Sequence, residues 1–160
     1  MLHLVPRVIM GILAVADTFL IYKISERRYN KNAALIASVL FAVMPMTWIL
    51  RRIYLDTLLM PLLLSSILFA IYIRGPKNNN VRQWPRININ KNLLVLLSGI
   101  FLGLAIYTKI PAFTMMPVVG YLVVSNSNSN RKKTLALWLA PVILIPLLWP
   151  AYAFSIGELD

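Results

Sequence analysis

Apolar residues fill six runs of this chain, and short polar segments separate them. The runs lie at roughly 8–22, 32–50, 57–73, 92–107, 112–124 and 134–154. A helix needs about 20 apolar residues to cross the ~30 Å hydrocarbon core of a bilayer, and several of these runs approach that length. Hydrophobic residues make up 59% of the chain, whereas soluble domains have roughly 45–50%. The sequence therefore predicts an all-α, polytopic transmembrane helical bundle of about six spans, forming one domain over residues 1–160.

The run 112–124 is the weakest of the six as a membrane span. Pro111 and Pro117 interrupt it and leave about 13 apolar residues. A proline removes a backbone donor and clashes with the preceding helical turn. We therefore expect a tilted, kinked or partial helix in this run.

Three tryptophans fall near the predicted ends of spans: Trp84, Trp138 and Trp149. Indole rings prefer the interface between the hydrocarbon core and water. We therefore expect these three side chains at the membrane surface.

The 16 basic residues are distributed unevenly among the polar segments. Twelve of them lie in the alternate segments 23–31, 74–91 and 125–133. Because basic residues concentrate in cytoplasmic loops, we expect these segments in the cytoplasm and both termini on the outer face of the cell membrane. This orientation also accounts for the net charge of +11, so nucleic acid is not an expected partner.

Four cations remain on the predicted outer face: Arg7, Arg51, Arg52 and Lys109. Arginine forks bind phosphate through two parallel hydrogen bonds. Cations gathered at one depth therefore suit an anionic lipid headgroup. The alternative is that each is an interfacial anchor whose long apolar stem lets the charge reach water.

Asp56 is the candidate catalytic residue, because it is the predicted external acid near these cations. It follows Arg52 by four residues and precedes an apolar run. A carboxylate in this place can act as a general base toward an acceptor hydroxyl. Alternatively, Asp56 caps the following helix and pairs locally, since the helix dipole favours an acid there. The two roles are compatible.

Chemistry based on cysteine or histidine is excluded by composition. The chain has no cysteine and one histidine, His3. Disulfides, metal sites built on these residues and a serine–histidine triad are therefore not expected. The sequence predicts no certain cofactor, and the need for a divalent cation stays open.

Two features inside the apolar runs favour a structural role over a direct function. Gly99 and Gly103 form a GxxxG pattern, which lets a second helix approach closely. Asp17 interrupts the first run and needs a partner, such as Thr18, Tyr22 or a residue on a neighbouring helix. For Asp17, structural pairing is favoured over proton relay, because intramembrane charges usually pair within the bundle.

Three segments, in this order and spacing, resemble the membrane glycosyltransferases of the GT-C class. The nearest types are the protein O-mannosyltransferases and the aminoarabinose transferases. Pro6-Arg7 opens a span that ends in a basic turn, and Leu55-Asp56 follows an alanine-rich span, a proline and an arginine. Residues 99–109 read Gly-x-x-x-Gly-Leu-Ala-x-x-Thr-Lys, as in the family. The resemblance covers about residues 6–124.

This resemblance implies a partial GT-C fold and a polyprenyl-phosphate-linked sugar donor, for example dolichyl-phosphate mannose. The sugar would pass to a protein, lipid or glycan acceptor at the outer face, with inversion. Arg7, Arg51 or Arg52, and Lys109 would contact the donor phosphate.

The chain departs from the family at its start. The family's acidic motif lies in an external loop ahead of these spans and supplies the catalytic base, whereas this sequence starts at Met1. We therefore expect an internal piece or a truncated reading frame of a longer enzyme. The alternative functions are a transporter or flippase segment for an anionic lipid and a structural membrane subunit.

Overall fold

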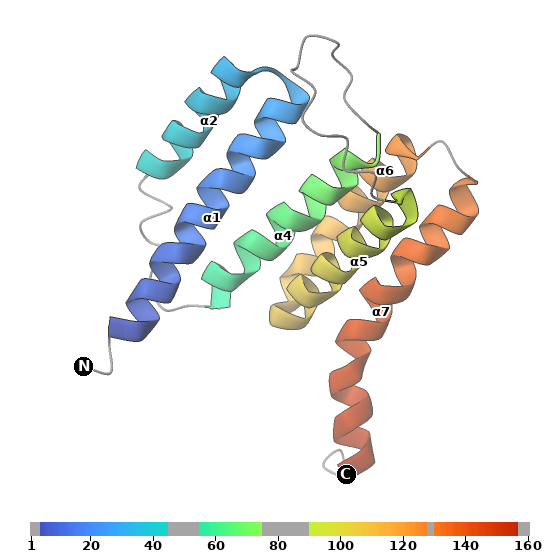
Figure 1. Cartoon of the computed structure of the whole chain (residues 1–160). Helices are drawn as coiled ribbons and strands as arrows, with labels where there is room; N and C mark the ends of the chain where they lie inside the picture. Colours follow the sequence, from blue (N-terminus) through green and yellow to red (C-terminus); the bar gives the residue numbers. More distant parts are fainter. Residues whose placement is uncertain (1–3, 45–54, 75–89, 128–129, 157–160) are drawn as a thin grey trace.

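The computed structural model describes residues 4–44, 55–74, 90–127 and 130–156 and is all-helical in these parts (Figure 1). The elements are α1 (Leu4–Arg28), α2 (Lys31–Val43), α4 (Leu55–Tyr72), α5 (Lys91–Thr108), the 3-10 helix η1 (Ile110–Met115), α6 (Met116–Asn126) and α7 (Arg131–Ile156). Each of the six apolar runs overlaps one α-helix of the described residues. The predicted all-α class is therefore confirmed.

The second helix is shorter than the sequence predicted. α2 ends at Val43, and Met44 adopts φ −59° and ψ 128°. Pro45 follows, and the residue before a proline is pushed out of the helical region. α2 therefore covers the first part of the predicted run 32–50, and residues 45–50 lie outside the described chain.

The fifth run is broken where the prolines predicted. Residues Ile110–Met115 form the 3-10 helix η1, with Pro111 in its first turn. The α-helix α6 then begins at Met116, with Pro117 in its own first turn. A proline fits the start of a helix because the N–H that it lacks would have no partner there. The expected partial helix is confirmed.

Two described helices are long and apolar enough to cross a membrane, Val8–Arg28 and Lys91–Thr108. Three further apolar stretches, Lys31–Val43, Thr57–Tyr72 and Ile110–Asn126, are shorter. A membrane location agrees with these helices, whereas six complete spans stay a prediction.

Successive helices run in alternate directions, so their ends gather at two ends of the bundle (Figure 1). One end holds the α1–α2 turn, the end of α4, the start of α5 and the α6–α7 connection. We call it the basic end, because its helix ends carry Lys23, Arg27, Arg28, Lys31, Arg74, Lys91, Arg131, Lys132 and Lys133. The opposite end holds the start of α1, the start of α4 and the junction between α5 and η1.

Helix α4 lies in the middle of the arrangement, in contact with α1, α5 and α6, while α7 packs on α5 and α2 packs on α1 (Figure 1). The hydrophobic core lies between α4, α5, α6 and α7, where Leu102, Val119, Val123 and Trp138 are fully buried. Helices α1 and α2 instead expose many apolar side chains, as helices in contact with lipid do.

Gly99 and Gly103 lie at the closest approach of α5 and α7. A Cβ atom on Gly99 would lie 2.6 Å from the carbonyl oxygen of Trp138, and one on Gly103 would lie 2.7 Å from that of Pro141. Real Cβ atoms do not come this close to other atoms, so only glycine allows this approach. The predicted packing role of the GxxxG pattern is confirmed.

Trp138 lies in the core, so its predicted place at the membrane surface is wrong. Its side chain is 2% exposed. The position of a Cβ atom on Gly120 of α6 lies 3.2 Å from the indole ring. The missing side chain of Gly120 leaves the space that the ring occupies. Trp84 and the side chain of Trp149 fall outside the described residues.

Candidate functional site

Two hydrogen bonds fix the register of α4 against α5. The Ser66 hydroxyl donates to the carbonyl of Ser98 at 2.9 Å, and the Ser98 hydroxyl donates to the carbonyl of Ser66 at 3.0 Å. The helices are antiparallel (Figure 1), and Leu55 and Lys109 each lie eleven residues from this crossing. Because both helices rise equally per residue, Lys109 lies about level with the first turn of α4.

A contact between α1 and α4 fixes a second register. The guanidinium carbon of Arg27 lies 4.5 Å from the centroid of the Tyr72 ring. The two helices run in the same direction (Figure 1), and seventeen residues back from this contact lie Met10 on α1 and Leu55 on α4. Arg7 then lies about one turn before Met10, toward the start of α1. The start of α1, the start of α4 and the end of α5 therefore lie at similar depths.

Lys109 is held between two helical elements. Helix α5 ends at Thr108, one residue after the predicted apolar run 92–107, and Lys109 is extended, with φ −155° and ψ 118°. Its N–H donates to the carbonyl of Ala105, and its own carbonyl accepts from the N–H of Ala112, both at 3.0 Å. The side chain is exposed. The backbone thus fixes Lys109 at one depth in an exposed position.

The other predicted site residues are placed by backbone alone or lie outside the described chain. Arg7 belongs to the first turns of α1, and Asp56 is the second residue of α4. Asp56 thus lies inside the first turn rather than at the cap, and the helix dipole still favours an acid there. Arg51 and Arg52 fall outside the described residues.

This end of the bundle suits an anion. The first turn of a helix carries unpaired N–H groups and the positive end of the dipole, which together attract phosphate. The start of α4 lies between α1 and α5, whose ends here carry Arg7 and Lys109. Within the described ranges, no three histidine or acidic residues come together to hold a metal ion. The arrangement therefore favours phosphate binding by cations and a helix start.

Asp17 is buried on α1, with 6% of the residue exposed. Its Oδ1 atom accepts no hydrogen bond from the described residues. Thr18, one of the partners considered from the sequence, donates its hydroxyl to the carbonyl of Ala14 at 2.9 Å instead. Thr18 is therefore not the partner of Asp17.

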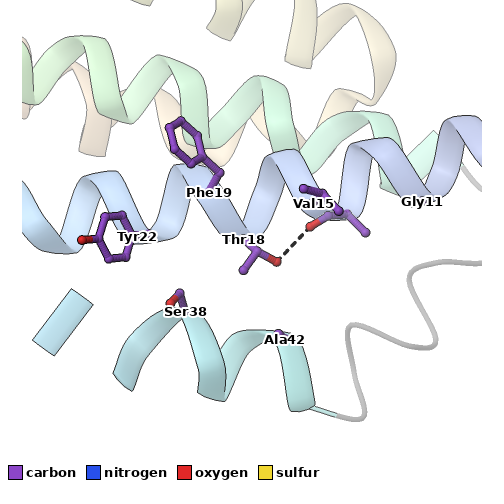
Figure 2. Close-up of a pocket in the computed structure, with 8 residues that line it drawn as sticks. Gly11, Val15, Thr18, Phe19, Tyr22, Ser38 and Ala42 are labelled. Carbon is purple, nitrogen blue, oxygen red and sulfur yellow. Dashed lines mark hydrogen bonds between the residues drawn. The ribbon is translucent and has the colours of Figure 1, made fainter. Parts of the chain in front are cut away.

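Sequence reasoning missed a groove of about 490 Å³ between α1 and α2. Figure 2 shows its lining residues along α1, opposite Ser38 and Ala42 of α2. Gly11 and Ala14 on α1 and the two small residues on α2 leave this space open. The spacing of small residues on both helices was the available sequence signal.

The family model described as "Dolichyl-phosphate-mannose-protein mannosyltransferase" matches residues 3–152 of the chain. No curated protein and no solved structure matches the chain. The matched range contains α1, α2, α4, α5 and α6 completely, together with most of α7.

Proposed function

The chain belongs to the dolichyl-phosphate-mannose-protein mannosyltransferase family, whose members are membrane glycosyltransferases, and on that premise we propose which residues serve the transfer. A mannosyl group passes from a polyprenyl-phosphate carrier to the hydroxyl of a protein, lipid or glycan acceptor at the outer membrane face. The donor phosphate is bound by Lys109, Arg7 and one of Arg51 and Arg52.

The shared depth of three helix ends carries this proposal. The Ser66–Ser98 and Arg27–Tyr72 contacts support a common level for the start of α4, the end of α5 and the first turns of α1. The opposite ends of these helices belong to the basic end, with Lys23, Arg74 and Lys91 among its residues. A donor whose phosphate lies in the headgroup layer would meet the cations at the level of Lys109.

The proposed reaction is a single displacement at the anomeric carbon of the donor. The acceptor oxygen forms a bond to this carbon as the bond to the phosphate oxygen breaks, which inverts the configuration. Negative charge develops on the leaving phosphate, where Lys109 and the arginines stabilise it. A base takes the acceptor proton, and Asp56 is the candidate for this role.

Removal of the Lys109 charge tests the phosphate site. A charge-assisted hydrogen bond contributes roughly 1.5–3 kcal/mol, so Lys109→Met should lower donor affinity about 10- to 150-fold. Lys109→Arg keeps the charge but replaces a compact ammonium with a planar fork, so it should restore part of the affinity. The measurement is donor affinity and transfer rate at matched expression.

Lys91→Met is the matched control, because Lys91 begins the same helix at the basic end. It should leave donor affinity unchanged. One of the two variants Arg51→Met and Arg52→Met should also leave donor affinity unchanged, because adjacent residues at a helix end point about 100° apart. Wild-type affinity in the Lys109 and both arginine variants would refute the phosphate site.

The proposed orientation is tested with single cysteines, because the chain has none of its own. A cysteine at Asn79 or Ser127 should be shielded from an impermeant thiol reagent in intact cells, and one at Tyr54 should be labelled. The reverse labelling pattern would place the basic end outside.

A further inference from the structure

The groove between α1 and α2 is apolar although three hydroxyl-bearing residues line it. The Thr18 hydroxyl donates to the carbonyl of Ala14, and the Ser38 hydroxyl donates to the carbonyl of Leu35, each at 2.9 Å. Both groups are thus satisfied within their own helices, which removes their need for a polar ligand. The groove is therefore mostly apolar, and its volume of about 490 Å³ is typical of ligand sites.

The groove is open where close helix packing would close it. A Cβ atom on Gly11 would meet nothing within 4 Å. The small residues Ala14, Ser38 and Ala42 line the same space, and Figure 2 shows Ser38 and Ala42 facing α1. A cavity without partner atoms forfeits dispersion contacts, so a lipid chain that fills it would be bound more favourably than bulk lipid.

The groove has about the length of one phospholipid acyl chain. Its α1 side runs from Gly11 to Tyr22, which are eleven residue steps apart along the helix. At 1.5 Å per residue this is about 16 Å. Half of the ~30 Å hydrocarbon core is about the same length. One acyl chain of a phospholipid therefore matches the groove, whereas a long polyprenyl chain would extend beyond it.

Cations lie at the end of the groove nearest the α1–α2 turn. The Lys23 ammonium lies 5.7 Å and 5.6 Å from the ring centroids of Phe19 and Tyr22, and both rings line the groove. Lys23 also forms an ion pair with Glu26 at 2.9 Å. One helical turn further, the exposed Arg28 and Lys31 flank the connection between the helices. The net charge of this end is positive.

We propose that the α1–α2 groove binds an anionic glycerophospholipid, with one acyl chain along Gly11–Tyr22 and the phosphate headgroup near Arg28 and Lys31. Basic pockets between membrane helices recognise anionic headgroups in this way. The headgroup would lie at the basic end, at the opposite end of the bundle from Lys109, while the acyl chain would reach Gly11, near the level of Leu55. The lipid would fasten the peripheral pair α1–α2 to the leaflet at that end.

Lipid binding to the purified full chain, followed by native mass spectrometry, tests this proposal. The probes are phosphatidylglycerol and phosphatidylcholine with identical acyl chains. Each Lys or Arg near a membrane surface contributes about fivefold in affinity for anionic lipid. Arg28→Gln with Lys31→Gln should therefore lower the preference for phosphatidylglycerol roughly 25-fold. Lys132→Gln with Lys133→Gln, at the same end but on α7, is the control and should keep the preference.

A second variant tests the groove itself. Gly11→Leu with Ala14→Leu fills the space and should abolish tight binding of phosphatidylglycerol, while Ala136→Leu on the exposed side of α7 should not. If Gly11→Leu with Ala14→Leu prevents folding, the charge variant still decides the question. Equal binding of the two lipids by the wild type, or unchanged binding in both groove and charge variants, would overturn the proposal. Tighter binding of dodecaprenyl phosphate that survives loss of Arg28 and Lys31 would also overturn it.

Discussion

Glycine lies at both the α5–α7 and the α1–α2 interfaces, with opposite outcomes. On α5, Gly99 and Gly103 lie so close to α7 that a Cβ atom would be 2.6–2.7 Å from its backbone carbonyls. On α1, Gly11 faces α2 across open space, with nothing within 4 Å of its Cβ position. A glycine therefore closes one interface and leaves the other as a groove.

The difference follows from the position of each helix pair in the bundle. In an 18-residue apolar stretch of α5, 44% of the residues are buried, whereas 6% are buried in the corresponding stretch of α1. The glycines of α5 face α7, which also contacts α6, so other helices of the bundle hold both members of this pair. Helix α2 packs on α1 at the edge of the bundle, and lipid can fill what the two helices leave open. Close packing of small residues thus depends on a partner that the rest of the bundle holds.

The largest expected effect comes from Gly99→Ala. Its new methyl group would lie 2.6 Å from the carbonyl oxygen of Trp138, a backbone atom that can move only with α7. Overpacking of this kind costs about 1–3 kcal/mol. We expect a clear loss of folded protein in a denaturant titration of the purified chain. A stability equal to wild type would mean that α5 and α7 are not in close contact.

An intermediate effect is expected at the crossing of α4 and α5. Ser66 and Ser98 are fully buried and exchange hydroxyl-to-carbonyl bonds between the helices. Bonds between membrane helices contribute about 0.6 kcal/mol on average, with a maximum near 1.7. Ser66→Ala and Ser98→Ala should each destabilise the fold by about this amount.

Ser38→Ala on α2 is the matched control for these serines. Its hydroxyl bonds to the Leu35 carbonyl of its own helix, so no contact between helices is lost. We expect no measurable change in the free energy of unfolding. An equal loss in all three alanine variants would show that the α4–α5 bonds have no special weight, and the register drawn from them would lose its support.

Much of the fold could be predicted from local sequence, and the relations between helices could not. The apolar runs predicted the six α-helices of the described residues, the prolines predicted the break at η1, and the GxxxG pattern predicted a close contact. The early end of α2 also has a local cause in Pro45. The burial of Trp138 instead depends on Gly120, from a different helix, so no local pattern could indicate it.

The candidate site shows the same division. The sequence identified Arg7, Asp56 and Lys109 as charges beside apolar runs. Their common depth rests on contacts at Ser66 and Tyr72, far along each helix. Such a register depends on how the helices pack. It could not be predicted from one segment at a time.

The smallest expected effect, with the opposite sign, comes from Gly11→Ala. Alanine is a better helix former than glycine by up to about 1 kcal/mol, and its methyl group would meet no atom within 4 Å. The variant should be as stable as wild type or slightly more stable in the same denaturant titration that detects the loss in Gly99→Ala. A destabilisation comparable to that of Gly99→Ala would mean that α1 and α2 pack closely in the membrane. The groove, and the contrast between the two glycine interfaces, would then not exist in the folded protein.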